Sequence, residues 1–66
     1  MKAIVNGDER ELRDGATIAH LLRELGAPEV GVAVARNERV VARGLHASER
    51  IADGDRIEII KAVAGG

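Results

Sequence analysis

A chain of 66 residues with a formal net charge of −1 is long enough for one small domain and has no charge excess that would attract nucleic acid or an anionic membrane. It contains no Cys and no aromatic residue, which excludes disulfides, thiolate metal sites and nucleobase stacking. Hydrophobic residues make up 45% of the sequence, so we expect a folded domain with an aliphatic core. Because the chain turns polar at Asn6 and has no apolar run of roughly 20 residues, we expect neither a signal peptide nor a membrane span, and a cytoplasmic protein.

The first part of the chain predicts a β-hairpin. Residues 2–6 alternate between two faces, Gly7-Asp8 signals a turn, and residues 9–13 form a second short run anchored by Leu12. A period of two on both sides of a glycine turn is typical of paired strands.

One helix is predicted after Thr17, whose hydroxyl can cap the first turn. Gly26 suits the position after the helix, and Pro28 prevents its continuation. Since His20 occupies the place of the usual Glu or Gln, we expect no capping box. The apolar stripe consists of residues spaced three and four apart: Ile18, Leu21, Leu22 and Leu25.

The second half predicts three more strands, over residues 30–36, 39–42 and 56–62, with a turn at Asn37-Glu38. The stretch between the last two is irregular, and Leu45 and Ile51 are its expected core anchors. Asp53-Gly54-Asp55 favours a turn over a calcium loop, because the other ligands of such a loop are missing.

The order strand, strand, helix, three strands indicates an α+β fold in which one helix covers one face of a mixed sheet of about five strands. A right-handed return after the helix places the last strand parallel to the first, at the sheet centre. This arrangement is the ubiquitin-like β-grasp; a ferredoxin-like sandwich would need a second helix. We expect a β-grasp domain over residues 1–62 and a flexible tail over residues 63–66.

No conventional active site is expected. The hydroxyl nucleophiles are limited to Thr17, which we expect to cap the helix, and Ser48 in the irregular stretch. His20 and His46 lack the spacing of a metal motif, and we expect both to be packing or surface residues. We therefore assign no catalytic residue and no metal site.

The Gly65-Gly66 pair has two interpretations. Two glycines can simply be a frayed end. Alternatively, because glycine has no Cβ, such a tail can thread a narrow channel and present a carboxylate. Adenylation by ATP would turn that carboxylate into an acyl group that a persulfide or an amine can attack.

Three segments resemble the ThiS family of thiamine-biosynthesis sulfur carriers, ubiquitin-like proteins related to MoaD. They are VAVARN before Val40-Val41, DGDRIEII at residues 53–60, and the ending AVAGG. The resemblance covers the whole chain. It departs from many relatives at residues 42–45, where a Pro and a Trp are absent, and at Ile60, where an aromatic residue is common.

The resemblance implies that an E1-like adenylyltransferase (ThiF) adenylates the Gly66 carboxylate with Mg-ATP. A sulfur donor, such as a cysteine desulfurase, would then convert it into a thiocarboxylate that supplies thiazole synthase (ThiG). Gly66 would be the modified residue, and Val63, Ala64 and Gly65 the segment that partners recognise. The carrier itself would bind no cofactor and catalyse nothing.

The residues also predict a docking patch. Ile60 and Ile4 have the parity opposite to their core-facing neighbours, so we expect them to form a small apolar patch on the open face of the sheet, where ThiF and ThiG dock. Other functions stay open at this point. They are a sulfur carrier for molybdopterin or tRNA thiolation, a ubiquitin-like protein modifier, and a regulatory or RNA-binding β-grasp module.

Overall fold

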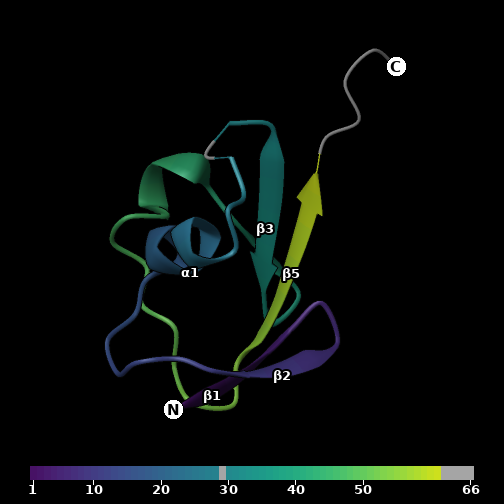
Figure 1. Ribbon diagram of the computed structural model, residues 1–66. Coiled ribbons are helices and arrows are strands. Elements are labelled where there is room, and N and C mark those ends of the chain that lie inside the picture. Colours follow the sequence, from purple (N-terminus) through teal and green to yellow (C-terminus); the bar gives the residue numbers. More distant parts are fainter. Residues whose placement is uncertain (29, 62–66) are drawn as a thin grey trace.

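The computed structural model describes residues 1–28 and 30–61 and shows a five-stranded sheet with one helix on one face (Figure 1). The elements in chain order are β1 (Lys2–Val5), β2 (Asp8–Glu11), α1 (Ile18–Glu24), β3 (Val32–Arg36), β4 (Arg39–Val41), a 3₁₀ turn η1 (Arg43–Leu45) and β5 (Arg56–Lys61). The strand order across the sheet is β2-β1-β5-β3-β4.

The last strand lies at the centre of the sheet, as predicted. β5 runs parallel to β1, with Ile4 opposite Arg56, and antiparallel to β3 along its full length. The hairpins β1–β2 and β3–β4 flank this central strand on either side. The α+β class and the mixed sheet with one covering helix are therefore confirmed.

The first turn of α1 corrects one prediction, because a capping box is present. Thr17 Oγ1 accepts a hydrogen bond from the His20 backbone N–H at 3.2 Å, and His20 Nδ1 accepts one from the Thr17 N–H at 3.1 Å. The His20 Nδ1 atom thus accepts the hydrogen bond that a Glu or Gln side-chain oxygen accepts in the usual capping box. The predicted helix end is confirmed, with Gly26 in the left-handed region at φ 68°.

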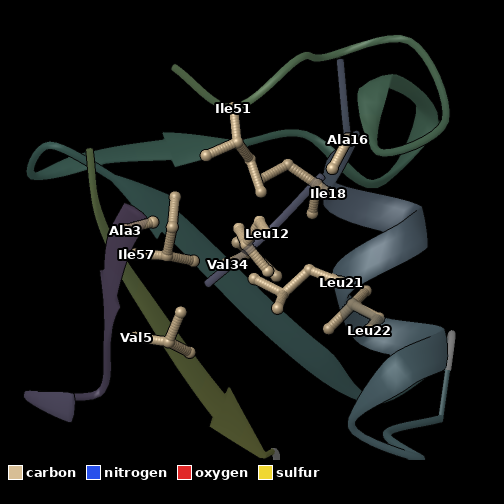
Figure 2. Packing of buried hydrophobic residues seen from close by; sticks show 10 residues of the cluster. All are labelled: Ala3, Val5, Leu12, Ala16, Ile18, Leu21, Leu22, Val34, Ile51 and Ile57. Atoms are coloured by element: carbon tan, nitrogen blue, oxygen red, sulfur yellow. The ribbon is translucent and has the colours of Figure 1, made fainter. Parts of the chain in front are cut away.

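The core is an aliphatic layer between α1 and the sheet (Figure 2). Ile18, Leu21 and Leu22 of the helix pack against the inner face, whereas Leu25 at the C-cap is partly exposed. The residues that complete the cluster are Ala3, Val5, Leu12, Ala16, Val34, Ile51 and Ile57. Ile51 is thus the buried anchor that the sequence predicted.

Leu45 is not a core anchor: half of its surface, 50%, is exposed. The η1 turn directs Leu45 outward and brings the next residue, His46, inside. The polar groups of the buried His46 have hydrogen-bond partners. Its Nε2 lies 3.1 Å from the Val41 carbonyl oxygen, and its backbone carbonyl accepts the Ala19 N–H. Of the two alternatives predicted for His46, a packing or a surface residue, the structure shows the packing residue.

Several strands end or begin at other residues than predicted. β3 begins at Val32, since Gly31 adopts φ 82° and cannot continue an extended strand. β4 ends at Val41, where Ala42 leads directly into η1. β2 likewise stops at Glu11, just before the buried Leu12.

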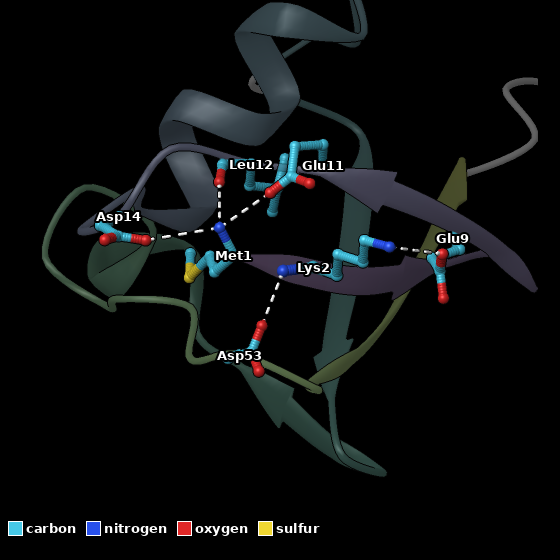
Figure 3. A network of polar contacts seen from close by, with 7 residues as sticks. All are labelled: Met1, Lys2, Glu9, Glu11, Leu12, Asp14 and Asp53. Carbon is cyan, nitrogen blue, oxygen red and sulfur yellow. Dashed lines mark hydrogen bonds and ion pairs between the residues drawn. The ribbon is translucent and has the colours of Figure 1, made fainter.

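A polar network fixes the start of β1 (Figure 3). The Met1 ammonium donates to Glu11 Oε2 at 2.8 Å and to the Leu12 carbonyl at 2.9 Å, and Asp14 Oδ1 lies 3.4 Å away. On the other side, the Lys2 backbone N–H donates to Asp53 Oδ1 at 2.7 Å, which connects β1 to the turn before β5. The parallel pair is therefore held at its beginning by side chains as well as by the ladder.

Candidate functional site: the C-terminal strand and the open face

The candidate site begins where β5 ends. Lys61 is the last residue that the structure describes, and it stands at the end of the central strand (Figure 1). The predicted tail residues Val63, Ala64, Gly65 and Gly66 lie outside the described residues, so their role stays a prediction. The structure describes β5, the strand that precedes these residues in the chain.

A buried charged cluster fixes the start of β5. Asp55 is 7% exposed and accepts hydrogen bonds from the Ala52 N–H at 2.7 Å and the Asn37 side-chain amide at 3.0 Å. Its Oδ2 also lies 3.0 Å from Arg36 Nε. The turn before β5 and the turn between β3 and β4 are thereby joined, and the tail extends from a strand anchored on both sides.

The open face of the sheet carries both residues of the predicted docking patch, but they are not neighbours. Ile4 lies opposite Arg56 in the register, and Ile60 follows four residues later along β5. At about 3.3 Å per residue this is a displacement of about 13 Å, with Glu58 between them on the same face. The expectation that Ile4 and Ile60 form one patch is therefore wrong, although both are on the predicted face.

Ile60 instead belongs to a different group of apolar residues, which we call the β3–β5 patch. Ile60, 60% exposed, pairs with Ala33, and Val40, 79% exposed, pairs with Ala35 on the same face. Val40 was not among the residues predicted for the docking patch. The sequence could have indicated it, because adjacent strand residues point to opposite faces and Val41, the next residue, is buried against the core.

The remaining polar candidates have structural partners. His20 caps the helix, His46 is buried against Val41, and the Ser48 hydroxyl donates to the Leu45 carbonyl at 3.3 Å. Within residues 1–28 and 30–61, no group of three or more His, Asp or Glu side chains could hold a metal ion. No helix in this part of the chain is long and apolar enough to cross a membrane.

The central parallel pair, the flanking hairpins and the single helix define a ubiquitin-like β-grasp. The crystal structure of the thiamine biosynthesis protein ThiS from Geobacter metallireducens matches it with a TM-score of 0.85 and 26% identity, covering 100% of both chains. The ThiS family model matches residues 3–66. The chain belongs to the ThiS family.

Two relatives add detail to this assignment. The sulfur carrier protein ThiS of Escherichia coli is 32% identical over 66 residues, which is 100% of each chain. The thiazole synthase of Paramagnetospirillum magneticum is 39% identical over 66 residues, all of this chain but 20% of the synthase. The chain thus spans about a fifth of the length of that relative, and the same holds for a second thiazole synthase, from Magnetococcus marinus.

Proposed function

We propose that this chain is a sulfur carrier for the formation of the thiazole ring in thiamine biosynthesis, with Gly66 as the residue that is modified. The observation that carries the proposal is the family match, which extends over residues 3–66 and so includes the two C-terminal glycines. The relative of equal length is named as a sulfur carrier, and the longer relatives are named as thiazole synthases. These names favour thiazole formation over molybdopterin or tRNA thiolation.

The chemistry requires little of the carrier beyond a presentable carboxylate. An E1-like adenylyltransferase would bind Mg-ATP, and a Gly66 carboxylate oxygen would attack the α-phosphorus with release of pyrophosphate. A persulfide from a sulfur donor, such as a cysteine desulfurase, would then attack the acyl carbon, and AMP would leave. A second thiol would then attack the donor sulfur of the resulting acyl disulfide, forming a disulfide with the donor cysteine and releasing the thiocarboxylate that thiazole synthase uses. The ATP and the catalytic groups belong to the partners.

The β3–β5 patch supports a docking role for the open face in this scheme. Ile60 lies one residue before the end of β5, so a partner that covers it also meets the start of the tail. The polar residue Glu58 separates this patch from Ile4, which lies opposite Arg56. We therefore place the docking contact at Ile60 and Val40 and leave Ile4 at its margin.

The test is the conversion of the purified chain by the E1-like enzyme with Mg-ATP and a sulfur source. Intact-mass analysis should show replacement of one oxygen by sulfur, and thiol-selective alkylation should map to Gly66. The alkylation step is needed because oxidation of Met1 adds nearly the same mass. A chain that lacks Gly65 and Gly66 is the control and should stay unlabelled. An unlabelled full chain would refute the proposal.

A further inference from the structure

β5 extends beyond the end of its parallel neighbour β1. The ladder between β1 and β5 ends at Val5 opposite Ile57, whereas β3 accompanies β5 as far as Lys61 (Figure 1). Asn6 turns the chain away with φ 50°, and its Oδ1 accepts the Ile59 N–H at 2.8 Å. The side chain of Asn6 thus adds one last bond after the β1 backbone has left the sheet.

Beyond Ile59, the backbone of β5 has an open edge. Hydrogen-bonded and non-hydrogen-bonded pairs alternate in an antiparallel ladder. Because the Ile59 N–H points to Asn6, the pair of Ile59 with Val34 is non-hydrogen-bonded, and so is the pair of Lys61 with Val32 two residues later. The Ile59 carbonyl and the Lys61 N–H therefore point to the open edge, where nothing among the described residues binds them.

This edge differs from the outer edge of the sheet at β2. All four residues of β2 are charged and exposed, which is a common protection against strand addition. The open edge of β5 carries Ile60 on one face and the half-buried Ile59 on the other. A groove of about 520 Å³ on the open face, lined by Ile4, Asn6, Gly7, Arg56 and Glu58, lies next to the start of this edge.

We infer that the β5 edge at residues 59–61 pairs with an extended segment of thiazole synthase by strand addition. The inference rests on the proposed function, because it concerns the partner to which the tail is delivered. Backbone hydrogen bonds would supply affinity in this mode, and alternate side chains would supply specificity. A carboxylate opposite Lys61 and an apolar side chain beside Ile60 would complement the edge.

One observation favours the synthase over a second copy of this chain. In the thiazole synthase relatives, a segment similar to this whole domain is part of the synthase chain itself.

The test compares Lys61→Pro with Lys61→Ala in binding to thiazole synthase. Proline removes the edge-facing N–H, and because this N–H makes no bond to β3, the ladder inside the domain stays intact. We expect Lys61→Pro to raise the dissociation constant about tenfold or more and to keep the wild-type melting temperature. Lys61→Ala removes only the side chain and should lose much less. Equal affinity of the two variants would overturn the inference.

Amide hydrogen exchange of the wild-type chain provides a test that needs no variant. The Lys61 amide should exchange rapidly in the free protein and slow at least tenfold when synthase is added. The Ile59 amide, already bonded to Asn6, is the internal reference. An unchanged Lys61 amide in the complex would also overturn the inference. If Gly66 is thiocarboxylated but synthase does not bind, strand addition fails while the carrier step stands. If Gly66 is never thiocarboxylated, the proposed function fails, whatever Lys61 shows.

Discussion

Arg36 Nε and Asp55 Oδ2 lie 3.0 Å apart, although the two residues are 19 positions apart in the chain, and they join the turn after β3 to the turn before β5. Asp55 also accepts from Ala52 and Asn37, and Asn37 in turn accepts the Arg56 N–H at 2.9 Å through its Oδ1. The first residue of the central strand is therefore positioned by side chains of the β3–β4 turn. The stability of the domain and the position of β5 depend on the same cluster.

Replacement of Asp55 by Ala should destabilise the domain by about 2–4 kcal/mol, because it leaves the donors of Arg36, Asn37 and Ala52 without their acceptor. Asp55→Asn keeps one acceptor oxygen and should cost less. Urea unfolding followed by circular dichroism measures both. The control is Glu49→Gln, which affects a more exposed partner of Arg36 and should cost about 1 kcal/mol or less. Equal losses for Asp55→Ala and Glu49→Gln would contradict this account.

Much of this fold follows from local patterns. The parity of residues in the last strand predicts that Ile57 and Ile59 face the helix while Ile60 faces away, and the structure agrees. The helix stripe and its glycine end are equally local signals. Such features need only the period of the element and its neighbours, which one sequence contains.

The failures concern residues whose environment is set by distant parts of the chain. Leu45 has the apolar side chain of a core residue, but the η1 turn leaves it exposed and buries His46 instead. The patch of Ile4 with Ile60 failed because parity gives the face of a strand but not the register between two strands. The sequence predicts only a turn at Asp55. Its role as a buried acceptor could not be predicted, because two of the groups that donate to it belong to Arg36 and Asn37, which are distant in the chain.

The capping box gives a second prediction. Thr17→Ala should cost about 1 kcal/mol, since it removes the acceptor for the His20 N–H. His20→Ala should cost less, and His20→Gln should restore the acceptor for the Thr17 N–H. Thermal unfolding of the two alanine variants and their double variant measures the coupling. Strictly additive losses would show that the two bonds do not act as a unit.

The Met1 amino group predicts a dependence of stability on pH. The hydrogen bond to Glu11, with a smaller contribution from Asp14, raises the pKa of this group above its ordinary value of 8.0 in the folded chain. Because the folded pKa is the higher one, this stabilisation is complete below the unfolded pKa and is lost as pH rises through the folded pKa. The melting temperature should therefore fall as the pH rises above about 8.

Glu11→Gln is the matched variant for this pH dependence. It removes the carboxylate that contributes most to the raised pKa, so its melting temperature should fall less steeply over the same pH range. Differential scanning fluorimetry at pH values from about 7 to 9.5, below the titration of lysine, is sufficient. Parallel curves for the wild type and Glu11→Gln would exclude the Met1 ammonium as the source of the slope.

Ile60→Asp should reduce the rate of adenylation by the E1-like enzyme at least tenfold at subsaturating carrier, because it places a charge in the middle of the β3–β5 patch beside the tail. The domain itself should be little affected, since Ile60 is 60% exposed and surface substitutions of this kind change stability by about 0.5 kcal/mol or less. Leu45→Asp is the control, with the same chemical change at a residue 50% exposed in the η1 turn, outside the strands of the sheet. Pyrophosphate release with each carrier measures the effect. If Ile60→Asp is adenylated as fast as Leu45→Asp, the open face is not the docking surface for that enzyme, and its recognition must depend on the tail alone.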